Sequence, residues 1–229
     1  MKKKINIIKA YYILNMKMLV REKLSFIWSI VLPAVMIIMS GASGYTEIDM
    51  RYYYAYILFS SYLFGVGLHS IRVRQNGSLK VFFSIREARY EFFTANILTQ
   101  ITYSCICISI LNVIVTILYR LNFVTLCGEM LVMVIGGLPI AFASCALSLI
   151  KNVHYGNINT IATICVTICL FLIGRPYWWN MFNPLYLTSN ILLIDSWMEL
   201  GIYGLVSAVA VFVGIRSVRQ YTVMSGEVR

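Results

Sequence analysis

The chain has 229 residues, of which 60% are hydrophobic and 12% are charged, and its mean hydropathy is +0.79. Soluble globular domains carry about 25% charged residues, so this composition excludes an ordinary soluble domain and predicts a membrane protein. One crossing of a bilayer needs roughly 20 mostly apolar residues. The chain therefore has room for about six crossings, and we expect no separate soluble domain.

The N-terminal segment 1–23 begins with a basic run like that of a signal peptide, but Lys9, Asn15 and Lys17 interrupt the apolar stretch, so we expect it to be retained. On a helical wheel one arc holds Asn6, Lys9, Lys17 and Arg21, and another side holds Ile5, Ile8, Tyr12, Met16 and Leu19. This pattern predicts an amphipathic helix in the inner membrane interface, with its basic side toward anionic headgroups. A solvated basic flank is the alternative.

Apolar windows after this segment predict six transmembrane helices, which makes the fold class an all-α membrane protein. The windows are 24–42, 53–71, 95–119, 130–150, 158–174 and 197–215, and a tail of residues 216–229 follows. Basic residues are retained on the cytoplasmic side of membranes. With the N-terminus inside, only Arg51, Arg120 and Arg175 of the 19 basic residues lie outside. The net charge of +10 thus predicts cytoplasmic termini, and it gives no reason to expect nucleic-acid binding.

The segment Arg74–Phe93 gathers charged and aromatic residues between two apolar windows. Asn76-Gly77 is a turn signal, and Ser84–Glu87 matches a capping box. We therefore expect a short helix over 78–83, a break, and a new helix from Ile85 into the third span. Leu79, Phe82 and Phe83 give the short helix an apolar side, which suits docking to another protein. The alternative is that the charges only fix topology.

The outer segment Arg175–Asp195 contains a Trp178-Trp179 pair of the kind found at membrane interfaces. Asn183-Pro184 stops a helix, yet Leu185–Ile194 is too apolar for a solvated loop. These features predict two short helices that dip into the outer leaflet, break at Pro184 and return, shielded by neighbouring helices. A plain interfacial loop is the alternative.

The spans lack the groups that several membrane activities require. No charged residue lies in the middle of a predicted span, which argues against an ion-coupled transporter and an intramembrane hydrolase. The sequence has no HExxH, GxSxG or GxxxxGK[ST] motif, so we expect no enzymatic activity and no ATP use by such a loop. Polar span residues more often tie helices together than bind substrate; they are Gln100, Asn112, Thr116, Ser144 and Ser148. The six cysteines are expected to pack as small hydrophobes without a metal.

In layout, nearly the whole chain resembles the permease subunits of type-2 ABC exporters. The resemblance rests on the N-terminal helix, the first span REKLSFIWSIVLPAVMIIMSG, the segment NGSLKVFFSIREARYEFFTANIL and the outer NPLYL before the last span. By this resemblance, segment 1–23 is an elbow helix with Lys9, Lys17 and Arg21, and Asn183 and Pro184 mark the break of a re-entrant hairpin. The coupling helix that sits on the ATPase would include Leu79, Lys80, Phe82, Phe83, Arg86, Glu87 and Arg89. The family often has a proline where Ile85 stands.

The resemblance also implies partners and a cargo. Two copies of a separate ABC ATPase would bind ATP and Mg, and this chain would bind no cofactor itself. A second copy of the permease, or a related one, would complete the pathway in the cytoplasmic membrane of a bacterium. The implied cargo is a hydrophobic or peptide substrate such as a bacteriocin, lantibiotic or drug. Lipid or polysaccharide export, and a non-transporting scaffold or sensor subunit, are the alternatives.

Overall fold

A computed structural model describes residues 2–21, 23–39, 46–78, 83, 88–150, 153–173 and 178–221. Every regular element in these ranges is a helix, which confirms the all-α prediction. The elements are α1 (Lys2–Arg21), α2 (Lys23–Met39), α3 (Glu47–Tyr62), the π-helix η1 (Leu63–Leu68), α4 (His69–Gln75), α6 (Arg89–Tyr119), α7 (Phe123–Gly136), α8 (Leu138–Ser144), η2 (Cys145–Leu149), α9 (Tyr155–Leu172), η3 (Trp178–Phe182), α10 (Pro184–Ser189), η4 (Asn190–Leu193) and α11 (Trp197–Gln220).

Five helical stretches in the described ranges are long and apolar enough to cross a membrane, which confirms the prediction of a membrane protein. They are Asp49–Gln75, Arg89–Tyr119, Phe123–Leu149, Tyr155–Leu172 and Trp197–Gln220. The first predicted window, 24–42, coincides with α2, which is apolar but has only 17 residues. A sixth crossing therefore stays a prediction.

Helix boundaries differ from the predicted windows where capping residues lie outside the most apolar stretch. The fourth span begins at Phe123, seven residues before the predicted start, because the Asn122 side chain accepts a hydrogen bond from the Val124 amide and caps the helix. The helix that enters the third span begins at Arg89, after the non-helical Ala88, and not at Ile85. The capping box predicted for Ser84–Glu87 lies outside the described residues.

Helix α3 is the centre of the bundle. In the best apolar window of the stretch Asp49–Gln75, which contains most of α3, 72% of the residues are buried, against 6% in that of α11. Its buried side chains Tyr54, Leu58 and Tyr62 pack in one core with residues of α6 and α7 such as Leu111 and Met133. The hydroxyl of Tyr54 donates to Asn112 Oδ1 at 2.6 Å. Asn112 therefore ties α6 to α3, as expected for a polar residue inside a span.

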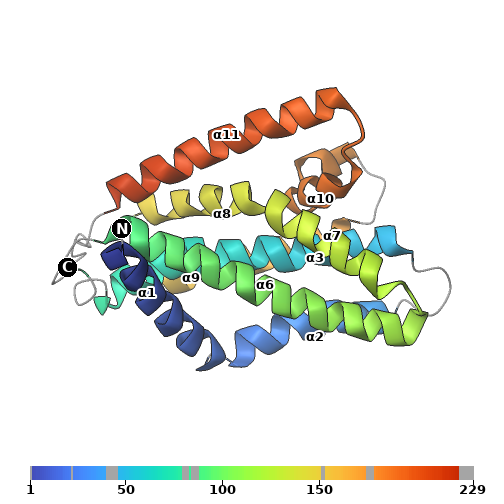
Figure 1. The fold of residues 1–229 in the computed structure, drawn as a ribbon, viewed down its shortest axis with the longest axis horizontal. Helices are drawn as coiled ribbons and strands as arrows, with labels where there is room; N and C mark the ends of the chain where they lie inside the picture. Colours follow the sequence, from blue (N-terminus) through green and yellow to red (C-terminus); the bar gives the residue numbers. More distant parts are fainter. Residues whose placement is uncertain are drawn as a thin grey trace.

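The two ends of the bundle differ in charge. In Figure 1, α1 begins and α11 ends at the left, and α10 lies at the opposite end. We call the left end the basic end because Arg72, Arg74, Arg89, Arg216 and Arg219 lie there, near the ends of α4 and α11 and the start of α6. Helix α6 has 31 residues, or about 46 Å at 1.5 Å per residue, and connects the two ends.

The outer surface is strongly apolar. On α9, Ile161 and Phe171 are 62% and 63% exposed, and on α11, Leu205 and Phe212 are 69% and 66% exposed. Monomeric soluble proteins rarely expose contiguous apolar patches of this kind. Such a surface fits contact with lipid or with another membrane protein.

Candidate functional site

Helix α1 packs on α6 through polar contacts. The Asn15 amide donates to Asn96 Oδ1 at 2.5 Å, and the hydroxyls of Tyr12 and Thr102 are 3.1 Å apart. Asn15 is only 6% exposed, so this residue, which interrupts the apolar pattern in the sequence, faces the bundle. Lys9 and Lys17 are exposed on the other side of α1. The side chain of Arg21 lies outside the described part of the chain.

An aromatic cluster at the basic end consists of Tyr11, Phe83, Phe92, Phe93 and Tyr221. Phe92 lies at its centre, with ring centroids 5.9 Å from Tyr11, 6.2 Å from Phe83, 5.5 Å from Phe93 and 6.5 Å from Tyr221. The Tyr221 hydroxyl donates to the backbone oxygen of Ser70 at 2.7 Å. Burial raises the pKa of Tyr221 above its usual value, against the opposing effect of Arg74, so the phenol stays neutral. The cluster joins α1, α4, α6 and the end of α11.

Only two of the seven predicted coupling residues lie in the described part of the chain. Phe83 is 7% exposed and packs in the aromatic cluster, so its side chain is buried in this chain's own bundle. Arg89 donates from Nη1 to the backbone oxygen of Arg219 at 2.7 Å and so joins α6 to α11. Leu79, Lys80, Phe82, Arg86 and Glu87 lie outside the described residues. Contact of this segment with an ATPase stays a prediction.

Arg74, the first residue of the segment that we associated with docking, has a structural role. It is 4% exposed, and its guanidinium donates to the backbone oxygens of Ser148, at 2.6 Å, and Ile150. These oxygens lie at the C-terminal end of η2, where backbone acceptors have no partner within the helix. Gln75 makes the same kind of contact with the start of α9: its amide donates to Val153 O at 2.6 Å, and its oxygen accepts from the Tyr155 amide at 2.8 Å.

Two short helices, η3 and α10, are separated at Asn183-Pro184. Pro184 is the first residue of α10, and the Asn183 side chain accepts from the Leu185 amide at 3.0 Å. The same side chain donates to Cys169 O at 2.8 Å, and the Asn180 amide donates to Leu172 O at 3.1 Å. The two asparagines thus satisfy carbonyls at the end of α9, which is the shielding that a broken backbone in a membrane needs. The depth of this segment in the membrane stays a prediction.

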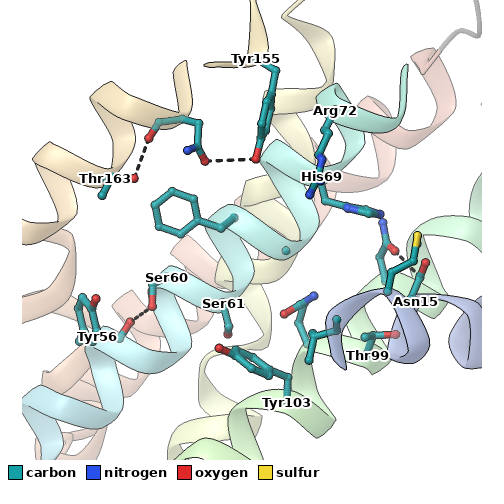
Figure 2. A pocket seen from close by; sticks show the side chains of 17 residues that line it. Asn15, Tyr56, Ser60, Ser61, His69, Arg72, Thr99, Tyr103, Tyr155 and Thr163 are labelled. Atoms are coloured by element: carbon teal, nitrogen blue, oxygen red, sulfur yellow. Dashed lines mark hydrogen bonds between the residues drawn. The ribbon is translucent and has the colours of Figure 1, made fainter. Parts of the chain in front are cut away.

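A polar cavity of about 240 Å³ lies between α1, α3, η1, α4, α6 and α9. Its lining consists of Asn15, Met18, Leu19, Tyr56, Ser60, Ser61, Phe64, Gly65, His69, Arg72, Asn96, Thr99, Gln100, Tyr103, Tyr155, Asn159 and Thr163. Figure 2 shows Arg72 and His69 toward one end of the cavity and Tyr56 and Tyr103 toward the other. Thirteen of these 17 residues carry polar side chains, although apolar atoms make up the larger part of the exposed lining.

The π-helix η1 shapes one wall of the cavity. Short π-helical segments occur frequently at functional sites. Gly65, in η1, leaves room for the Gln100 side chain of α6, which occupies the space that a Cβ at residue 65 would need. Gln100 also lines the cavity.

Several polar groups in the lining are held in place by hydrogen bonds or ring contacts. The hydroxyl of Ser61 is 2.6 Å from that of Ser104, and the Tyr155 hydroxyl donates to Asn159 Oδ1 at 3.3 Å. The guanidinium carbon of Arg72 lies 5.9 Å from the centre of the Tyr155 ring, in cation–π range. Sequence reasoning missed this cavity as a site. Its available signal was the polar series Ser60, Ser61, Asn96, Thr99 and Gln100 inside apolar helices.

No protein-family model matches the sequence, and no curated protein or solved structure matches it significantly. Within the described residues, no group of three or more His, Cys, Asp or Glu side chains could hold a metal ion. The two histidines are separated: His69 lines the cavity, whereas His154 caps α9 by accepting from the Gly156 amide at 3.2 Å.

Proposed function

We propose that this protein is the permease subunit of an ATP-driven ABC exporter whose ATPase is a separate polypeptide. The observation that carries the proposal is the construction of the basic end. The aromatic cluster, Arg74 and Arg89 connect four helices directly beside the segment that the sequence resemblance assigns to ATPase coupling. A force applied to that segment would therefore pass to α1, α4, α6 and α11 together.

The course of the chain supports six crossings in this proposed permease. The start of α1 and the end of α11 lie at the same end of the bundle, which supports an even number of crossings. The five long helices are an odd number, and α2 is the available sixth. The end of α2 meets the end of α6, where the Tyr119 hydroxyl donates to Ile37 O at 2.7 Å.

The proposed complex contains two ATPase subunits, which bind ATP and Mg, and a second permease copy or a related permease. The largely exposed apolar faces of α9 and α11 are available for lipid and for such a partner. The proposed cargo is hydrophobic or peptidic, such as a bacteriocin, lantibiotic or drug, exported across the cytoplasmic membrane of a bacterium. The apolar outer surface and the lack of charged groups in the middle of the predicted spans support a cargo that does not need an ion-coupled site.

Purification of the tagged protein from its native host in mild detergent tests the proposal. We expect an ABC ATPase to be recovered with it and ATP hydrolysis to be measurable in the complex. Recovery without any nucleotide-binding partner would contradict the proposal and favour the scaffold or sensor alternative.

A charge-reversal variant tests the coupling segment separately. Glu87→Lys should leave membrane insertion intact while lowering ATPase recovery and uncoupling ATP hydrolysis from transport. The matched control is Asp195→Lys, which makes the same charge change at the opposite end of the bundle, where its side chain is exposed. Equal ATPase recovery and activity in both variants would disprove the coupling assignment.

A further inference from the structure

The polar cavity has the chemistry of an anion site. Arg72 supplies a full positive charge, and no acidic side chain lines the cavity among the described residues. The amide of Gln100 adds hydrogen-bond donors. The amide nitrogen of Asn96 is buried and has no hydrogen-bond partner in the described part of the chain, although its oxygen accepts from Asn15. A ligand rich in acceptor oxygens and negative charge would match this set.

The size of the cavity limits the ligand to a small group. A volume of about 240 Å³ equals roughly eight water molecules at about 30 Å³ each. Sites for drug-sized molecules run from about 300 to 1,000 Å³. The cavity therefore fits a head group, and it is too small for a whole amphiphile with its chains.

The depth of the charged end matches the head-group region of a bilayer. Arg72 is three residues, or about 5 Å, from the end of the stretch Asp49–Gln75. Tyr155, which stacks with Arg72, is the first residue of the stretch Tyr155–Leu172. The polar head-group layers add about 5 to 8 Å on each side of the hydrocarbon core, so a long side chain about one turn from the end of a crossing helix can reach lipid phosphates.

We propose that this cavity binds the phosphate-bearing anionic head group of a membrane lipid. Arg72 pairs with the phosphate, and the amides of Gln100 and Asn96 donate hydrogen bonds to its oxygens. Tyr56 and Tyr103 line the cavity away from Arg72 (Figure 2). The inference requires no ATPase partner, so it goes beyond the proposed function and can fail or hold independently of it.

Lipid binding to the purified full-length chain tests the inference. Phosphatidylglycerol is titrated into delipidated protein in detergent, and bound lipid is counted by native mass spectrometry, with phosphatidylcholine of the same acyl chains as the neutral comparison. We expect one preferred phosphatidylglycerol and about tenfold or more weaker binding in Arg72→Gln, the loss expected for one charge-assisted hydrogen bond. The matched control is Arg216→Gln, which removes an exposed arginine at the same end but outside the cavity. It should bind like the unchanged protein.

Gln100→Leu provides a second variant if Arg72→Gln does not fold. It keeps a side chain of similar size against Gly65 while removing the amide, and we expect several-fold weaker binding. Competition by soluble glycerol phosphate would show that the cavity recognises the phosphate group itself. If only the intact lipid binds, the phosphate that the cavity recognises belongs to a membrane lipid. Three results would overturn the proposal. They are an equal loss of phosphatidylglycerol binding in Arg72→Gln and Arg216→Gln, binding of phosphatidylcholine as tight as that of phosphatidylglycerol, and unchanged binding in both Arg72→Gln and Gln100→Leu.

Discussion

Tyr221 shows how much one residue contributes at the basic end. It follows the last residue of α11, yet it is 1% exposed, because its ring packs against Phe92 and Phe93 and its hydroxyl reaches the Ser70 backbone in α4. It also lies under the guanidinium of Arg74, at 5.8 Å from the ring centre. Two parts of the chain that are 151 residues apart are thereby joined by one side chain.

Tyr221→Phe should lower the free energy of unfolding by about 1 kcal/mol, because it leaves the ring in place and removes one buried hydrogen bond. Thermal unfolding of the detergent-solubilised protein measures this change. Tyr90→Phe is the matched control, since Tyr90 is 53% exposed on α6 near the same end. A shift of equal size in both variants would contradict the structural role of the Tyr221 hydroxyl.

At the scale of elements, the contact between α11 and α8 depends on a glycine. A Cβ added to Gly214 would lie 2.5 Å from the backbone oxygen of Phe142, and backbone cannot move aside as a flexible side chain can. Gly204, three turns earlier on the same helix, has nothing within 4 Å of the corresponding position. The two glycines therefore allow the same substitution with opposite expected effects.

Gly214→Ala should destabilise the protein by about 1 to 3 kcal/mol, the usual range for overpacking. Gly204→Ala should be neutral or stabilising by up to about 1 kcal/mol, because alanine has the higher helix propensity. The midpoints of thermal unfolding of the two variants and the unchanged protein provide the comparison. A destabilised Gly204→Ala together with an unaffected Gly214→Ala would show that α11 does not pack on α8 in this way.

The short helices η3 and α10 provide a second test at this scale. Asn183→Asp keeps the cap on the Leu185 amide but places a carboxylate oxygen against the carbonyl of Cys169 in place of a donor. We expect a loss of about 1 to 3 kcal/mol in unfolding free energy, the cost of unsatisfied buried polar groups.

Asn122→Asp is the control for this variant, because Asn122 is an exposed helix cap whose side chain accepts from Val124. Aspartate caps helices as well as asparagine does, so its unfolding midpoint should change little. The role assigned to Asn183 would be wrong if the two aspartate variants were equally stable.

For the whole molecule, the predicted topology can be tested without any substitution. All eight lysines, including Lys9, Lys17, Lys80 and Lys151, fall on the predicted cytoplasmic side. A membrane-impermeant amine reagent should therefore leave the protein unlabelled in intact cells and label it after lysis, as read by peptide mass spectrometry. Asp195→Lys adds one lysine on the predicted outer side and should be labelled in intact cells. Labelling of native lysines in intact cells would reverse or refute the topology.

The membrane class and most helix positions could be predicted from the sequence because a crossing is a local property: about 20 apolar residues in a row are sufficient. The start of α10 at Pro184 is likewise local, since proline acts on its own neighbours. The role of Arg74 could not be predicted, because the carbonyls that it binds belong to Ser148 and Ile150. The cavity could not be predicted for the same reason, because its lining comes from α1, α3, α4, α6 and α9, which are distant in the sequence.

The π-helix η1 has a consequence for insertions and deletions. A π-helical turn holds one residue more than an α-helical turn, so relative to a regular helix it rotates everything after it by about 100°. The direction in which α4 presents Arg72 and Arg74 is therefore set within Leu63–Leu68. Removal of one residue there, together with the wide turn, would leave the direction of both arginines nearly unchanged, because the two effects cancel. A regular α-helix formed by the same number of residues would instead turn both arginines by about 100°, away from the cavity and from η2. Such a chain would keep its length of apolar helix and lose the alignment on which the basic end is built.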